Sequence, residues 1–169
     1  MKVIGDAVFR LSQAMYFIAG VLLLGMVVVI LVEVVGRTLF GATAGTIDFT
    51  FIGGIEIVSH ALLFMVLFTL PHAVSRGQVI VDLFTEGLSE RAKGILAGVY
   101  TLGFGVLGAA MTVRFIESAH SVASSGQVTQ DLQMPLSTIY GVTACATAVL
   151  ALRGVLEALR QIVESVKAS

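Results

Sequence analysis

The sequence contains one cysteine, no tryptophan and few charged residues. Because Cys145 is the only cysteine, an internal disulfide and a metal site built from several thiolates are both excluded. Without tryptophan, any aromatic belt at a membrane surface must consist of the three tyrosines and ten phenylalanines. Charged residues make up only 12% of the chain and the net charge is −1, so the composition gives no indication of a nucleic-acid-binding surface.

Apolar residues, in contrast, are abundant. They make up 57% of the 169 residues, and the mean hydropathy is +0.99. A soluble domain of this size could not bury so much apolar surface. Four runs of 19 to 22 residues contain no charge: 11–32, 57–75, 94–113 and 132–152. At about 1.5 Å per helical residue, each run is long enough to cross a bilayer core of about 30 Å.

These runs predict an all-α integral membrane protein, with four transmembrane helices in a single membrane domain over residues 1–169. We expect the spans at about 11–33, 52–75, 94–115 and 134–153.

The lysines and arginines indicate the orientation. Eight of them lie in the N-terminal tail, between the second and third spans, or in the C-terminal tail, whereas only Arg37 and Arg114 lie in the other connections. Since basic residues accumulate on the cytoplasmic side, we expect both termini in the cytoplasm. Between the second and third spans, Ile80, Leu83 and Phe84 begin an apolar pattern at helical spacing. This pattern predicts a short amphipathic cytoplasmic helix over about 79–90, lying on the membrane surface.

Two polar pairs lie at the expected outer ends of the first two spans. Glu56 and His60 are four residues apart in "FIGGIEIVSHALLFMVLFTLPH", and Glu33 and Arg37 have the same spacing. Side chains at this spacing share one face of a helix and can interact. The Glu56–His60 pair has three interpretations: a solvated helix end, a buried contact with another membrane protein, or a proton or ion relay. We predict that all four residues belong to a subunit interface.

Small residues mark the third and fourth spans. They allow helices to approach closely without a hydrophobic driving force. Their partner is either another helix of this chain or a separate subunit. The candidate packing positions are Gly94, Gly98, Gly105, Gly108, Gly141, Ala144 and Ala148.

The histidines do not suggest a cofactor. His60 and His72 share one helix at a separation of about 18 Å, and His120 lies near an outer boundary. A bis-histidine haem needs facing ligands at equal depth, which this set does not provide. We therefore expect no cofactor, no metal site and no catalytic residue in this chain.

Four stretches resemble the small membrane subunit of tripartite ATP-independent periplasmic (TRAP) transporters. "VEVVGRTLFG" is similar to the end of that family's first helix, with Arg37 in the place of its usual arginine. "GGIEIVSHALLFMVLFTLPHAVSRGQVIVDLF" resembles its acidic second helix and the turn that follows. "GLSERAKGI" and "SSGQVTQDLQMPLSTIYGV" are similar to its short basic link and its outer loop. Three features depart from the family: Gln78 replaces a usual histidine, the second helix has one glutamate, and tryptophan is missing.

The resemblance implies a non-enzymatic subunit of a bacterial inner-membrane uptake system. In this family a large multi-span subunit carries the substrate and sodium, and a periplasmic binding protein delivers a carboxylate or related organic anion. We expect both as partners, together with membrane lipids. The alternatives are the small four-helix subunit of a tricarboxylate-type tripartite transporter and a self-sufficient small membrane exporter.

Overall fold

The computed structural model describes residues 2–46, 52–74 and 89–167. The described residues form four α-helices: α1 (Lys2–Ala42), α2 (Gly54–Ala73), α4 (Glu90–Ser125) and α5 (Leu136–Lys167). All four are long and apolar enough to cross a membrane. The predicted all-α fold with four membrane-spanning helices is therefore confirmed.

The predicted surface helix lies outside the described residues, except at its last two positions. There Ser89 caps α4, because its side chain accepts a hydrogen bond from the backbone N–H of Ala92 at 3.3 Å. Gln78 also lies outside the described residues.

Three of the helices extend well beyond the uncharged runs. α1 has 41 residues, α4 has 36 and α5 has 32. Charged residues at their ends continue the helices, partly through ion pairs between side chains four residues apart, such as Arg160 with Glu164 at 2.9 Å. Absence of charge thus marks a segment that fits within a bilayer core, not the whole helix.

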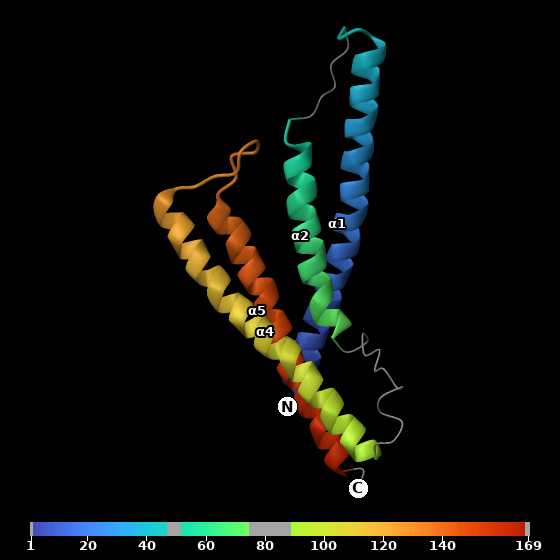
Figure 1. The fold of residues 1–169 in the computed structure, drawn as a ribbon, viewed down its shortest axis with the longest axis vertical. Coiled ribbons are helices and arrows are strands. Elements are labelled where there is room, and N and C mark those ends of the chain that lie inside the picture. The colour runs from blue at the N-terminus through green and yellow to red at the C-terminus, as the bar shows by residue number, and fades with distance from the viewer. Residues whose placement is uncertain (1, 47–51, 75–88, 168–169) are drawn as a thin grey trace.

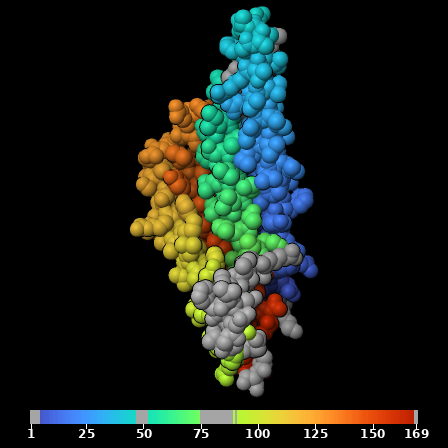
Figure 2. All heavy atoms as spheres, turned by 45° about the vertical axis from the view of Figure 1, so that its right-hand side comes forward, coloured from blue at the N-terminus to red at the C-terminus, as the bar shows by residue number. Residues whose placement is uncertain are grey.

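The helices form two antiparallel hairpins, α1 with α2 and α4 with α5 (Figure 1). The hairpins meet in the half of the molecule where both chain termini lie, which we call the closed end, and α4 and α5 continue past the meeting point. They diverge toward the opposite end, which we call the open end. In Figure 2, α2 lies between α1 and the α4–α5 hairpin, and α1 extends past the other helices at the open end.

The apolar core is small and lies where the hairpins meet. It consists of Met15 from α1, Leu67 from α2 and Ala146 from α5, with Phe68 and Met111 packed against it. Most of the remaining apolar surface faces outward, and only 6% of the most apolar window of α1 is buried. This surface needs lipid or another protein to cover it.

The helices α4 and α5 are in close backbone contact. A Cβ atom on Gly154 would lie 2.6 Å from the backbone nitrogen of Gly105, and a Cβ on Gly108 would lie 2.7 Å from that of Ala151. No side chain fits at such distances. Two hydrogen bonds cross the same contact, from Thr101 to Gln161 at 3.1 Å and from Thr112 to Thr147 at 3.0 Å.

The residues of this contact recur at alternating spacings of four and three on both helices. We call this set of residues the small-residue seam. On α4 they are Gly94, Gly98, Thr101, Gly105, Gly108 and Thr112, and on α5 Thr147, Ala151, Gly154, Ala158, Gln161 and Ser165. A heptad spacing keeps one face of each helix in contact over many turns. The four predicted glycines of the third span therefore pack within this chain.

The three predicted packing positions of the fourth span differ from one another. Ala144 is buried and Ala148 is half-buried. A Cβ on Gly141 would meet no atom within 4 Å among the described residues.

Candidate functional site

The most specific polar contact in the described structure starts at Glu56, in the first turn of α2. Its Oε2 atom accepts hydrogen bonds from the backbone N–H groups of Asp131 at 2.7 Å and Leu132 at 3.2 Å. Glu56 thus holds the connection between α4 and α5, and this contact joins the two hairpins at the open end.

Gly53 allows α2 to start close to this connection. Its φ of +96° lies in the left-handed region that favours glycine, and a Cβ there would lie 2.8 Å from Cδ2 of Leu132. Both the backbone conformation and the short distance to Leu132 favour glycine at this position. Glycine therefore lets α2 begin next to residues 131–132.

The connection between α4 and α5 is itself ordered by hydrogen bonds. The backbone N–H of Thr129 donates to the carbonyl of Met134 at 2.9 Å, and the N–H of Leu136 donates to the carbonyl of Gln127 at 3.1 Å. The Thr129 hydroxyl also accepts from the N–H of Met134 at 3.0 Å. Because the loop is closed on itself in this way, fixing residues 131 and 132 at Glu56 fixes the whole loop against α2.

His60 lies one turn further along α2. Its Nδ1 atom is 2.8 Å from the backbone carbonyl oxygen of Glu56. The two residues therefore interact, as their spacing predicts, but through the backbone of Glu56. The Glu56 carboxylate instead accepts hydrogen bonds from the α4–α5 connection.

The second predicted pair forms an ion pair on α1. A guanidinium nitrogen of Arg37 lies 2.8 Å from Oε1 of Glu33. The Arg37 side chain is 66% exposed and the Glu33 side chain 18% exposed. An ion pair with one partner so exposed contributes little to stability. The pair is of interest because it places two charged groups near the open end.

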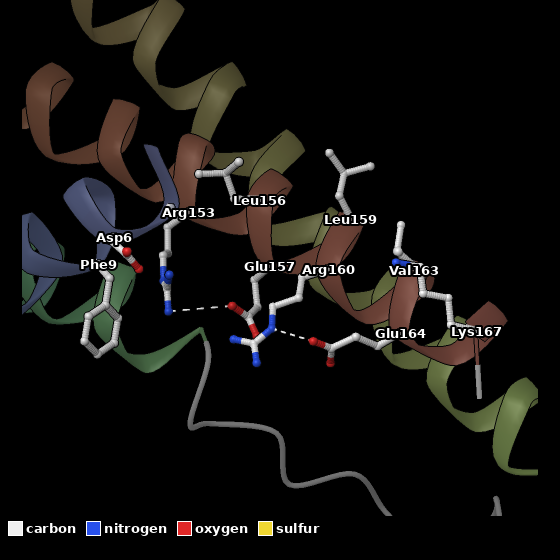
Figure 3. Close-up of a pocket in the computed structure, with 11 residues that line it drawn as sticks. Asp6, Phe9, Arg153, Leu156, Glu157, Leu159, Arg160, Val163, Glu164 and Lys167 are labelled. Carbon is white, nitrogen blue, oxygen red and sulfur yellow. Dashed lines mark hydrogen bonds and ion pairs between the residues drawn. The ribbon is translucent and has the colours of Figure 1, made fainter. Parts of the chain in front are cut away.

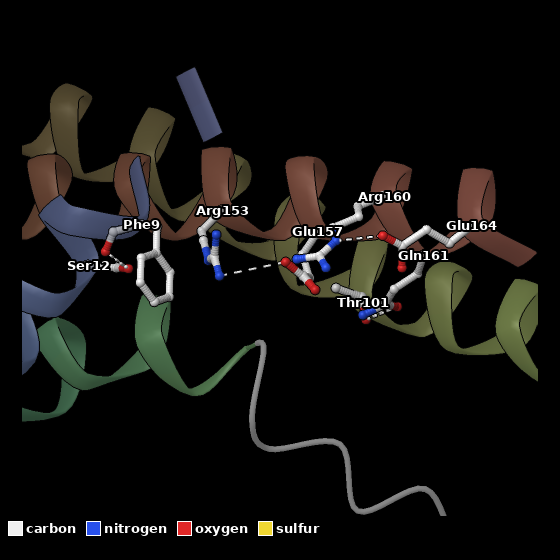
Figure 4. A network of polar contacts seen from close by, with 8 residues as sticks. All are labelled: Phe9, Ser12, Thr101, Arg153, Glu157, Arg160, Gln161 and Glu164. Atoms are coloured by element: carbon white, nitrogen blue, oxygen red, sulfur yellow. Dashed lines mark hydrogen bonds and ion pairs between the residues drawn. The ribbon is translucent and has the colours of Figure 1, made fainter. Parts of the chain in front are cut away.

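Sequence analysis missed a cluster around Arg153 at the closed end. The Arg153 side chain is only 9% exposed, lies 3.6 Å from the Glu157 carboxylate and has its guanidinium carbon 5.1 Å from the centre of the Phe9 ring (Figure 3). Figure 4 shows that these residues connect α5 to α1. The rings of Tyr16 and His72 lie 4.8 Å apart and connect α1 to α2. A buried arginine thus holds together the junction of the hairpins.

The signal for this cluster was present in the sequence. Arg153 directly follows the last uncharged run, and Glu157 comes four residues later, which is the spacing of an ion pair on a helix. Considered by its charge and position alone, Arg153 contributes only to the expected cytoplasmic excess of basic residues.

Among residues 2–46, 52–74 and 89–167, no group of three or more histidine, cysteine or acidic side chains is placed to hold a metal ion.

Comparison with known protein families gives a match. The family model described as "Tripartite ATP-independent periplasmic transporters, DctQ component" matches residues 26–164, which cover all or part of each of the four helices. No curated protein and no solved structure matches the chain. The chain therefore belongs to the DctQ family, the small membrane component of tripartite ATP-independent periplasmic transporters.

Proposed function

We propose that this chain is a non-catalytic subunit that scaffolds the large transport subunit of a sodium-coupled uptake system in the bacterial cytoplasmic membrane. A periplasmic binding protein supplies that system with carboxylates or related organic anions. Sodium and substrate bind the large subunit, and both termini of this chain face the cytoplasm. The observation that carries the proposal is the family match over residues 26–164.

The exposed surface of the fold supports a scaffolding role. The most apolar helix, α1, contributes very little to the core, so nearly all of its surface is available to lipid or to a partner helix. A chain that transported a solute by itself would need polar groups near the middle of the membrane. Here Glu33 and Glu56 lie toward the open end. The match to the DctQ family also favours this function over a small exporter or a tricarboxylate-type subunit.

We further propose that the open end is part of the interface with the large subunit. The Glu33–Arg37 pair and His60 supply polar groups on the surfaces of α1 and α2. Glu56 contributes indirectly, since it fixes the α4–α5 loop against α2.

The test is purification of the tagged chain from native membranes in a mild detergent, followed by identification of the proteins that co-purify. We expect a large multi-span membrane protein. Vesicles containing both proteins should take up an organic anion only when the binding protein and an inward sodium gradient are present. Uptake by vesicles that contain this chain alone would contradict the proposal.

A further inference from the structure

A groove of about 750 Å³ lies at the closed end, between the start of α1 and the second half of α5 (Figure 3). Phe9, Leu156, Leu159 and Val163 give it apolar walls, and Arg153 lies at one end of it. The groove is separate from the contact between Glu56 and the α4–α5 loop, which lies at the open end.

The apolar wall belongs to a second heptad pattern on α5. Alternating spacings of four and three relate the residues of this stripe, which are Leu152, Leu156, Leu159, Val163 and Val166. The small-residue seam on the same helix is covered by α4, whereas Leu159 and Val163 are 43% and 47% exposed. A helix with apolar residues at this spacing is suited to pack against another helix along its length.

The groove also contains a buried donor without an acceptor. Among the described residues, no atom accepts a hydrogen bond from Nε of Arg153, although the side chain is only 9% exposed. Within the described part of the chain, Arg153 is paired with one acid, Glu157, at 3.6 Å from a terminal guanidinium nitrogen. A buried donor normally has a partner, and a carboxylate is the strongest protein acceptor for arginine. The groove therefore suits an occupant that brings an acidic side chain to Arg153.

The charges along α5 argue against a second copy of this chain. Arg153, Arg160 and Lys167 recur every seven residues along one edge of the apolar stripe. An antiparallel copy of α5 would place this basic edge against itself, and like charges across a helix pair are unfavourable. A parallel copy would place it against Val155 and Ile162, which carry no carboxylate.

We propose that this groove receives an amphipathic helix of the large membrane subunit. Apolar side chains of that helix pack on Leu156, Leu159 and Val163, and one of its carboxylates pairs with the guanidinium group of Arg153. The inference rests on the proposed scaffolding function and assigns it a second contact at the closed end.

The test is photo-crosslinking in membranes that contain the whole transporter. A photoreactive phenylalanine is placed at Leu159, and in a control chain at Leu96, which is 50% exposed on α4 and does not line the groove. We expect an adduct with the large subunit from position 159, at several-fold higher yield than from position 96. Peptide mapping should place the adduct on a helix that carries an acidic residue.

A second arm tests the role of Arg153. Arg153→Gln removes the guanidinium group and its charge, and should lower the adduct yield at position 159 several-fold. The matched control is Arg114→Gln on α4, outside the groove, whose side chain is 83% exposed and paired with Glu117. It should leave the yield within about twofold, since an exposed pair of this kind contributes little. Should Arg153→Gln fail to accumulate, the adduct from the otherwise unaltered chain still decides the question.

The other outcomes overturn the inference. They are an adduct with another part of the same chain, with a second copy or with lipid alone, and equal yields from positions 159 and 96. If the large subunit co-purifies but gives no adduct at position 159, the groove is not its docking site and the proposed function is unaffected. If the large subunit does not co-purify at all, the proposed function fails as well.

Discussion

The carboxylate of Glu56 accepts a hydrogen bond of 2.7 Å from the backbone N–H of Asp131, a residue 75 positions further along the chain. This contact lies at the start of α2, whereas the Arg153–Phe9 contact lies where the start of α1 meets the middle of α5. The first joins α2 to the α4–α5 loop, and the second joins α5 to α1. Between them, they hold together two hairpins that share only a small apolar core.

Glu56→Ala should release the α4–α5 loop from α2, because the N–H groups of Asp131 and Leu132 lose their acceptor. We expect several-fold lower co-purification with the large subunit and lower uptake in reconstituted vesicles, while the chain still inserts. Glu56→Gln keeps an acceptor oxygen and should have a milder effect. Unchanged co-purification and uptake for Glu56→Ala would show that the loop contact is not needed for assembly.

Gly154→Ala should separate α4 from α5, since the added methyl group would lie 2.6 Å from the backbone nitrogen of Gly105. We expect a loss of stability of about 1–3 kcal/mol, as is typical of overpacking. The matched control is Gly141→Ala on the same helix, where the methyl group meets no described atom within 4 Å and should be neutral or stabilising. Thermal melts in detergent, followed by circular dichroism, measure both variants. Equal melting temperatures would refute the close contact.

Arg37→Ala should have only a small effect on the isolated chain, because the side chain is 66% exposed. We expect a change in stability of about 0.3–0.5 kcal/mol, the usual range for such a pair on a helix. A double-mutant cycle with Glu33→Ala in detergent measures the coupling. A much larger effect on co-purification than on stability would indicate that a partner covers this pair.

The orientation of the chain is tested by reporter fusions. Both termini lie at the closed end, and the α4–α5 loop lies at the open end. A reporter fused after Ser169 should be active in the cytoplasm, and one inserted at Gly126 should be active in the periplasm. A periplasmic signal from the fusion at Ser169 would reverse the assignment.

The predicted surface helix over about 79–90 is tested by labelling. In a Cys145→Ser background, a cysteine at Glu86 should react with a water-soluble maleimide much faster than a cysteine at Leu88, because only the first lies on the polar face. Similar rates at both positions would argue against a helix on the membrane surface.

The four helices could be predicted because a bilayer requires about 20 apolar residues for each span. Their full lengths could not, since α1 and α5 continue through charged residues that form pairs within the same helix. The close packing of the third span was predicted from its glycines. The partner helix was left open, because a small residue permits contact with any backbone that approaches it.

The partners of Glu56 could not be found from the sequence. They are backbone N–H groups, and every residue except proline carries one, so nothing distinguishes Asp131 and Leu132 before the chain folds. His60 has the spacing of a side-chain pair with Glu56, yet its ring bonds the backbone carbonyl. The carboxylate remains available for a contact that only the tertiary fold supplies.

The sequence separation of the Glu56 contact has a consequence for biosynthesis. At roughly 5–20 residues per second, a ribosome makes Glu56 several seconds before it makes the 75th residue after it. During that interval α2 must reach the membrane with its carboxylate still hydrated. The hydrogen bond can form only after α4 and the residues that follow it, up to Asp131, have been translated. Its formation therefore cannot precede synthesis of the α4–α5 connection.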